Sequence, residues 1–319
     1  MKKEFLQKLL QYNNILIAIH VHPDGDCIGA ALALHRVLKK QFNKKVTVFS
    51  KDPIPESCKF LPNIYNIINK EKPDNYDLLL LADVNSVKRT QLPESMLNDN
   101  IFIIDHHERI DFPHNEDIIN SNASSACEII YDFFKENNIE IDKTVAEYLM
   151  TGIICDTGSF VFSNTTAKVF LIASQLTELG ANSAIITKKY FKDKPISSLK
   201  VLGQVLNNLK TFCNNQIVIG YLDYDFFINN PGISIDSDSI NEQLQSVKGH
   251  KLSVFLRETE PNKIRGSLRS PNTVDCNKIA MIFDGGGHKN AAGCTINMSL
   301  EKAIDIIVKE GAKAVINDD

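Results

Sequence analysis

Short apolar runs alternate with longer helical patterns over the first 180 residues of this 319-residue chain. The runs that have the length and composition of buried strands are 14–20, 46–49, 77–82 and 101–104. The segments that repeat apolar residues at helical spacing are 28–40, 124–136, 143–155 and 166–179. This alternation predicts an α/β domain with a doubly wound, mostly parallel sheet that is covered on both faces.

The pattern changes after Gly180, where a second and smaller domain is expected. Residues 188–194 are rich in charge and precede Pro195, so we expect a linker at 188–200 between a domain at 1–187 and a domain at 201–319. The segments that predict a mixed α/β arrangement in the second domain are strands at 216–222, 251–257 and 263–269, and helices at 274–283 and from Leu300 onward.

His and Asp residues recur where the predicted elements of the first domain end. They are His20, Asp24 and Asp26 after the first strand, Asp83 after the third, Asp105, His106 and His107 after the fourth, and Asp156 after the helical segment 143–155. Any one of them could cap a helix or form a turn. Their recurrence is harder to explain in this way, because the carboxyl ends of parallel strands meet at one edge of a sheet. Carboxylates crowded there repel one another unless divalent cations neutralise them, so the sequence predicts a metal centre.

The ligand types indicate which metal would bind. Imidazole and carboxylate groups without a thiolate suit a hard or borderline ion, so we expect two Mn²⁺ ions, with Mg²⁺ or Co²⁺ as alternatives. Two ions about 3.5–4 Å apart that share one bridging carboxylate form the clamp used for phosphoryl displacement by water.

Charge and cysteine usage limit the expected partners and compartment. Lys plus Arg is 35 and Asp plus Glu is 39, which gives a net charge of −4. Proteins that coat long nucleic acid carry a basic excess, so we expect short ligands and no long nucleic acid. The seven cysteines are scattered without a C-x-x-C pair, which indicates reduced thiols. The first apolar run is too short for a signal peptide or a membrane span, which favours a cytoplasmic protein without membrane association.

Several motifs together resemble the DHH phosphoesterases. These motifs are His20-x-x-x-Asp24-x-Asp26, Asp105-His106-His107 and Asp156-Thr157-Gly158. The segment Gly285-Gly286-Gly287-His288, followed by Lys-Asn-Ala-Ala-Gly, resembles the substrate-binding domain called DHHA1. The segment from Gly266 to Ser270 is similar to the branch of oligoribonucleases (nanoRNases) that also dephosphorylate 3′-phosphoadenosine-5′-phosphate. The resemblance covers nearly the whole chain and implies a DHH domain, a DHHA1 domain and an active site in the cleft between them.

The resemblance also implies a role for each polar residue. His20, Asp24 and Asp83 would hold one metal, and Asp26, Asp83, His106 and Asp156 the second, so that Asp83 is the bridge. Metal-bound hydroxide would attack the phosphate. His107 would be free of metal, contact the scissile phosphate and help to protonate the leaving oxygen. Asp105 would orient a histidine or cap the following turn, and both readings stay open.

The substrate end is predicted in the second domain. Three glycines before a histidine remove side chains and let the backbone approach an anion, so Gly285, Gly286, Gly287 and His288 are expected to form a substrate-binding turn. Arg269 and Ser270 end a predicted strand, and Arg269 can fork onto a phosphate. Arg257 and Arg89 are further candidates that an exposed ion pair would explain equally well.

The activity implied is hydrolysis of short oligoribonucleotides to nucleoside monophosphates, and of 3′-phosphoadenosine-5′-phosphate to AMP and phosphate. A phosphodiesterase for cyclic diadenylate or its linear product is the main alternative. A manganese-dependent inorganic pyrophosphatase fits less well, because that group carries a dense Arg-Lys motif in a different C-terminal domain. A non-catalytic nucleotide-binding module also fits less well, because all six ligand positions are filled. A homodimer is a further expectation.

Overall fold

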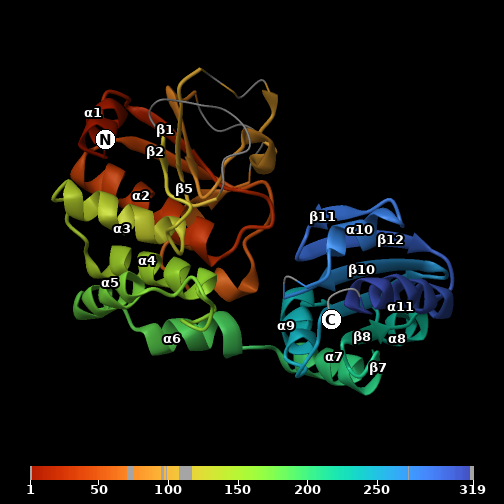
Figure 1. The fold of residues 1–319 in the computed structure, drawn as a ribbon. Coiled ribbons are helices and arrows are strands. Elements are labelled where there is room, and N and C mark those ends of the chain that lie inside the picture. The colour runs from red at the N-terminus through yellow and green to blue at the C-terminus, as the bar shows by residue number, and fades with distance from the viewer. Residues whose placement is uncertain are drawn as a thin grey trace. The chain divides into compact units, whose positions relative to one another are not determined.

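The computed structural model describes residues 2–69, 75–94, 97, 99–107, 117–271 and 273–316. The chain divides into two compact units, Met1–Asp193 and Lys194–Asp319 (Figure 1). The division falls within the segment expected as a linker. The helical turn η5 (Lys188–Lys192) occupies the start of that segment, and helix α7 (Ile196–Asn207) begins near its end.

The first unit is built on a six-stranded parallel sheet. Its strands are β1 (Asn14–Ala18), β2 (Lys45–Phe49), β3 (Ile67–Ile68), β4 (Leu78–Ala82), β5 (Ile101–Asp105) and β6 (Ile118–Ile119). Their spatial order is β3-β2-β1-β4-β5-β6, and every neighbouring pair is parallel. This order confirms the predicted sheet. Successive strands are added on one side of β1 up to β3 and on its other side from β4 onward, so the topological switch point lies between β1 and β4. Ligands of such sheets bind beyond the carboxyl ends of the strands at that point.

Helices cover one face of this sheet in layers (Figure 1). They are α1 (Lys2–Leu9), α2 (Gly25–Gln41), α3 (Ala126–Glu136), α4 (Lys143–Asp156), α5 (Ala167–Glu178) and α6 (Ser183–Thr187). Helix α2 lies on β1, β2 and β4, and α4 packs on α2. On the other face, Val84 and Leu92 bury the apolar side chains of the central strands, together with Val87 from the short helix η3 (Val87–Thr90). The remaining 3₁₀ turns are η1 (Glu56–Cys58) and η2 (Ile64–Asn66).

The second unit has a mixed sheet, as predicted. Its strands are β7 (Lys210–Phe212), β8 (Ile217–Leu222), β9 (Leu252–Glu260), β10 (Lys263–Arg269), β11 (Gly286–His288) and β12 (Ala291–Asn297). The order is β11-β12-β10-β9-β8-β7, in which only β8 and β9 are parallel. The helices are α7, α8 (Tyr224–Asn229), α9 (Ser237–Gln245), α10 (Cys276–Met281) and α11 (Leu300–Ile316).

The two faces of this sheet differ. Ile264 and Leu268 of β10 point into the core formed with α10 and α11. Because side chains alternate along a strand, Arg265, Ser267 and Arg269 point to the opposite face. Phe255 packs on that opposite face against residues of α7 and α9.

A helix that crosses a membrane must be both long and apolar. Among the described residues no single helix is both, although the pair Ala167–Glu178 and Ser183–Lys192, bent by 108°, meets both conditions in combination.

Candidate metal centre

The strand ends of the first unit bring the predicted ligands together. His20 lies two residues beyond β1, and Asp83 directly follows β4, so the two residues flank the switch point of the sheet. His106 directly follows β5. Asp24 caps α2, because its Oδ1 accepts the backbone N–H groups of Asp26 and Cys27 at 3.0 and 3.1 Å.

Asp83 lies between two groups of ligand atoms. Its Oδ2 is 3.4 Å from Nε2 of His20, and its Oδ1 is 3.4 Å from Nε2 of His106. The residue is 1% exposed, and its Oδ1 is buried without a hydrogen-bond partner among the described residues. A buried carboxylate oxygen without a donor is costly unless a cation neutralises it. This position therefore fits a metal-bridging carboxylate.

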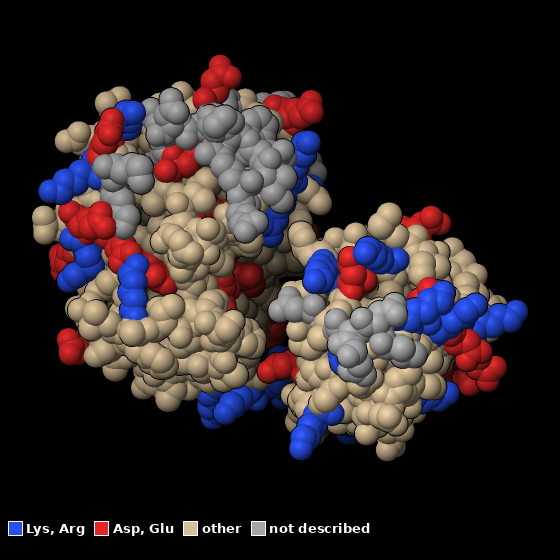
Figure 2. Space-filling model, in the orientation of Figure 1, with Lys and Arg blue, Asp and Glu red and all other residues tan. Residues whose placement is uncertain are grey.

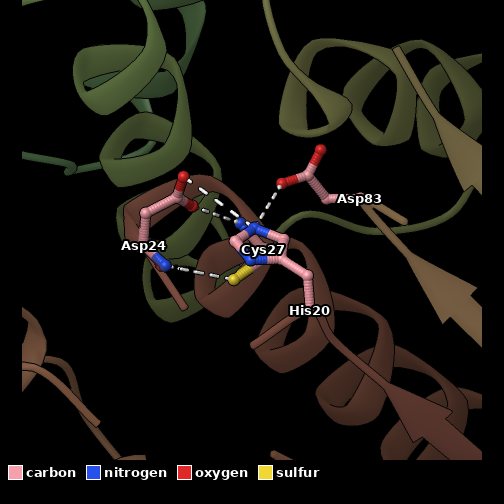
Figure 3. A group of neighbouring side chains, drawn as sticks. All are labelled: His20, Asp24, Cys27 and Asp83. Carbon is pink, nitrogen blue, oxygen red and sulfur yellow. Dashed lines mark hydrogen bonds and ion pairs between the residues drawn. The ribbon is translucent and has the colours of Figure 1, made fainter. Parts of the chain in front are cut away.

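The first group of ligand atoms is formed by His20, Asp24, Cys27 and Asp83, which lie within 4.8 Å of one another. Figure 3 shows the carboxylates of Asp24 and Asp83 on either side of the His20 imidazole. Nδ1 of His20 lies 2.8 Å from the carbonyl oxygen of Val21, to which it can donate, and this leaves Nε2 available to a metal ion. Nε2 is 3.9 Å from Oδ2 of Asp24, so Asp24 caps the helix with one oxygen and faces His20 with the other.

The second group is formed by Asp26, His106 and Asp156. Nε2 of His106 is 3.2 Å from Oδ2 of Asp156 and 4.0 Å from Oδ2 of Asp26. Asp26 is fully buried, and its two oxygens accept the backbone N–H groups of Ala126 and Cys127 at 2.6 and 2.9 Å. These two amides lie at the start of α3, so that helix fixes the orientation of the carboxylate.

Electrostatics also indicate that the cluster needs cations. Burial, followed by the charge of Asp156, raises the pKa of Asp26 to about 7. Burial and the charges of Asp26 and Asp24 raise the pKa of Asp83 well above its usual value. Burial alone would lower the pKa of His106, but its hydrogen bond to Asp156 and the charge of Asp26 raise it to about 9. Buried carboxylates with raised pKa values are stabilised by a nearby positive charge, so the cluster fits divalent cations.

His107 is oriented by Asp105. Oδ1 of Asp105 accepts the backbone N–H of His107 at 3.1 Å and lies 2.8 Å from its Nδ1. Asp105 thus fixes both the turn and the imidazole, which combines the two alternatives left open by the sequence. Although burial would raise the pKa of Asp105, its hydrogen bond with His107 lowers that pKa below the ordinary value. The imidazole of His107 is 37% exposed, so it remains accessible to a ligand.

The predicted substrate residues lie in the second unit. The prediction of a turn at Gly285–His288 is wrong, because Gly286–His288 forms the edge strand β11. Of the three glycines, only Gly285 lies before this strand. Arg269 and His288 are both paired with Ala291, so they share one face of the sheet. The Ser270 hydroxyl is buried and accepts the backbone N–H of Val274 at 2.8 Å, which gives it a structural role.

Two residues at the candidate metal centre were not predicted from the sequence, one within the first group and one beside it. Cys27 brings a sulfur atom to the first group, although burial and the charges of Asp24 and Asp83 raise its pKa and keep it a thiol there. Tyr190 belongs to the segment expected as a linker, yet its hydroxyl accepts the N–H of Gly25 at 3.1 Å and lies 2.8 Å from Sγ of Cys155. No spacing rule in the sequence connects residue 190 with the Asp24 turn, because that contact depends on how η5 packs.

Arg265 was missed as well. Its signal was present, because the alternation in Lys263-Ile-Arg-Gly-Ser-Leu-Arg269 places several polar residues on one face of a strand. Arg257 lies opposite Arg265 on β9 and, among the described residues, has no ion-pair partner. The exposed ion pair considered for Arg257 is therefore not found.

Comparisons with known proteins match both units. The model of the DHH family, N-terminal domain, matches residues 14–153, and the model of the DHHA1 domain matches residues 214–314. The bifunctional oligoribonuclease and PAP phosphatase NrnA of Thermus thermophilus is 30% identical over 301 residues, which cover 92% of this chain and 88% of that protein. The protein of the same name from Bacillus subtilis is 26% identical, with 93% of each chain covered.

A solved structure is similar over the full length. An exopolyphosphatase-related protein from Bacteroides fragilis has a TM-score of 0.89 and 27% identity, and the match covers 100% of this chain and 98% of that one.

Proposed function

Because the chain belongs to the DHH family of phosphoesterases and carries a DHHA1 domain, we propose that it is a hydrolase of short phosphorylated nucleotides. It cleaves short oligoribonucleotides to nucleoside monophosphates and converts 3′-phosphoadenosine-5′-phosphate to AMP and phosphate. The similarity to two proteins named bifunctional oligoribonuclease and PAP phosphatase supports this choice of substrates.

The observation that carries the proposal is the position of Asp83. One of its oxygens faces His20, and the other, buried without a donor in the described part of the chain, faces His106. We assign His20, Asp24 and Asp83 to one divalent cation, and Asp26, Asp83, His106 and Asp156 to a second. Two bound cations would lower the pKa of a water molecule towards neutrality and neutralise the phosphate charge.

The protein's own groups then position and protonate the substrate. Asp105 holds the His107 ring with Nδ1 towards itself, which leaves Nε2 to contact the scissile phosphate and to donate a proton to the leaving oxygen. His107 is therefore proposed as the catalytic acid, with Asp105 as its positioning residue.

The substrate end is assigned to one face of the second sheet. Arg269 is 28% exposed and lies on the same face as His288, and together they offer a guanidinium fork and an imidazole to a phosphate or base. Gly285, Gly286 and Gly287 keep the neighbouring backbone free of side chains. Ser270 supports Arg269 through its bonds to the following turn rather than through a free hydroxyl.

The ligand types suit Mn²⁺, and we propose it as the working metal, in a cytoplasmic protein that forms homodimers. On the face drawn in Figure 2, acidic and basic side chains of the described residues are intermingled rather than gathered into a broad basic surface. That distribution fits a ligand bound by a few local groups and disfavours long nucleic acid.

The test is Mn²⁺-dependent turnover of RNA two to five nucleotides long and of 3′-phosphoadenosine-5′-phosphate. Asp83→Ala should abolish both activities and lower the amount of bound metal. Asp132→Asn removes a carboxylate of the same unit that pairs with Lys168, and it should retain the activity of the parent protein.

Three outcomes would contradict the proposal. Near-parent activity of Asp83→Ala would remove the assignment of the metal centre. Faster turnover of cyclic diadenylate or inorganic pyrophosphate than of short RNA would replace the substrate class. Binding of Mn²⁺ without turnover of any phosphate ester would make the chain a nucleotide-binding module.

A further inference from the structure

A cavity of about 530 Å³ lies within the second unit, beside the face of the sheet that carries Arg269, and Phe283 and Cys294 from the core of the opposite face also line it. Residues that line this cavity include Arg257, Arg265, Ser267, Gly285, Gly293 and Thr295. Arg269 is not among its lining residues, so the cavity is separate from the contact already assigned to that side chain.

Two arginines form one wall of this cavity. Arg257 on β9 and Arg265 on β10 are directly opposite each other in the antiparallel ladder. The Cβ atoms of such a pair are about 5 Å apart, and like charges at this separation destabilise a sheet. Among the described residues, neither guanidinium has a carboxylate within ion-pair distance, although the exposed Asp284 also lines the cavity.

The environment of Arg257 is unfavourable in a second way. Its Nε is buried without a hydrogen-bond partner among the described residues, and its guanidinium lies over the ring of Phe255 at 5.7 Å. Burial, followed by the charge of Arg265, lowers the pKa of Arg257. Arg257 is a partly desolvated cation that lies opposite a second arginine. An anion that contacts both guanidinium groups would stabilise such an arrangement.

The floor of the cavity is bare backbone. A Cβ added at Gly293 would meet only the carbonyl oxygen of Gly266, at 3.7 Å, so the space above this residue is open. Thr295 is paired with Arg265 in the ladder and adds a hydroxyl on the same face. A group with several acceptor oxygens could therefore enter and contact both arginines.

The distance between Arg265 and Arg269 indicates what kind of ligand could carry this anion. Arg265 is four residues from Arg269 along β10, which corresponds to about 13 Å at the usual rise of a strand. Two phosphates of one extended nucleotide chain can therefore occupy the cavity at Arg265 and the site at Arg269. A single phosphate is too small to lie above both residues.

We propose that the cavity at Arg257 and Arg265 binds a further phosphate group of an oligonucleotide, beyond the nucleotide that Arg269 contacts. The inference rests on the proposed function, because it extends the same substrate chain. It makes the second unit a length-sensing surface, on which a tetranucleotide gains contacts that a dinucleotide lacks.

The experiment compares 5′-phosphorylated diadenylate with 5′-phosphorylated tetraadenylate on the full chain. Arg257→Gln with Arg265→Gln removes the two charges, and Gly293→Val fills the open floor while it keeps both charges. Valine suits a strand, so this second variant tests the cavity even if the double variant unfolds. Lys302→Gln is the matched control, because Lys302 is exposed on α11, which packs on the opposite face of the sheet.

Binding is measured by calorimetry in EDTA, and turnover is measured separately with Mn²⁺. Both cavity variants should weaken tetraadenylate binding about tenfold more than diadenylate binding, which corresponds to about 1.4 kcal/mol. The slope of log affinity against log salt should fall by about 0.7 for the tetranucleotide in the double variant, as expected when one phosphate contact is lost. The control should bind both ligands as the parent does.

Equal losses for the two lengths, or no loss for either, would overturn the inference. A parent protein that binds both oligonucleotides but hydrolyses neither would instead contradict the proposed function. Because binding is measured without metal, the length comparison still decides the role of the cavity in that case.

Discussion

The charge balance of the metal centre can be tested by replacing Asp83 with asparagine. Asp83 has a φ of 59°, a left-handed conformation that asparagine tolerates about as well as aspartate. The substitution therefore removes the negative charge with little change of backbone or volume. In the metal-free protein it should raise the melting temperature at pH 8, because a fully buried carboxylate surrounded by other carboxylates no longer has to be protonated or tolerated.

Metal should stabilise the parent protein much more than the Asp83→Asn variant. A ligand present at 100 times its Kd adds about 2.7 kcal/mol to the free energy of unfolding, so two filled sites add about 5 kcal/mol. The first unit spans Met1–Asp193, and in a domain of this size 1 kcal/mol shifts the melting temperature by about 2–4 °C. The parent protein should therefore gain roughly 10–20 °C with saturating Mn²⁺. Asp83→Asn should gain far less, because both sites share the lost ligand.

The assay is thermal unfolding at pH 8 in EDTA and in Mn²⁺, together with measurement of bound metal. Asp132→Asn, which removes a carboxylate paired with Lys168, should show the full shift of the parent. If Asp83→Asn gained as much stability from Mn²⁺ as the parent does, Asp83 would not be the bridging ligand. If it were less stable than the parent in EDTA, the argument from repulsion would be wrong.

Two further predictions concern the surroundings of the centre. A Cβ at Gly152 would lie inside the contact distance of Cys127 Sγ and of Asp26 Oδ1, so Gly152→Ala should destabilise the protein by about 1–3 kcal/mol and weaken Mn²⁺ binding. Gly203→Ala, where no atom lies within 4 Å, is its control, and equal melting temperatures for the two variants would contradict the clash. The pKa values of Asp26, raised to about 7, and of His106, raised to about 9, predict that the metal-free protein loses stability as pH rises from about 6 to about 9. Both groups bind protons more tightly when folded, so a urea midpoint in EDTA that rose over this range would contradict the prediction.

The sequence was sufficient to predict which polar residues lie close together, because the topology of the sheet determines where the strands end. Once short apolar runs are recognised as parallel strands, His20, Asp83 and His106 must meet at the carboxyl edge, whatever the loops between them do. The same reasoning could not find Tyr190 or Cys27. Their positions depend on the packing of η5 and on the first turn of α2, which no local pattern specifies.

The glycine segment illustrates a different limit. Three consecutive glycines favour a turn by local preference, yet Gly286–His288 is a strand because Gly293, Ala292 and Ala291 of β12 offer it a ladder. Strands β11 and β12 are the two arms of a hairpin, and the pairing between them outweighs the local preference of the glycines for a turn. The register that makes this segment a strand also places His288 on the same face of the sheet as Arg269.

Departures from ordinary folding rules coincide at Asp83. The residue is non-glycine at positive φ, its carboxylate is buried, and one of its oxygens has no donor among the described residues. Each feature alone would cost stability, and a structural role in a helix cap or a turn would remove at least one of them. Asp24 shows the contrast, because its cap of α2 satisfies Oδ1 with two backbone amides. A residue that retains all three costs at the switch point of a parallel sheet is explained by a ligand that offsets them together, and two cations that share this carboxylate would do so.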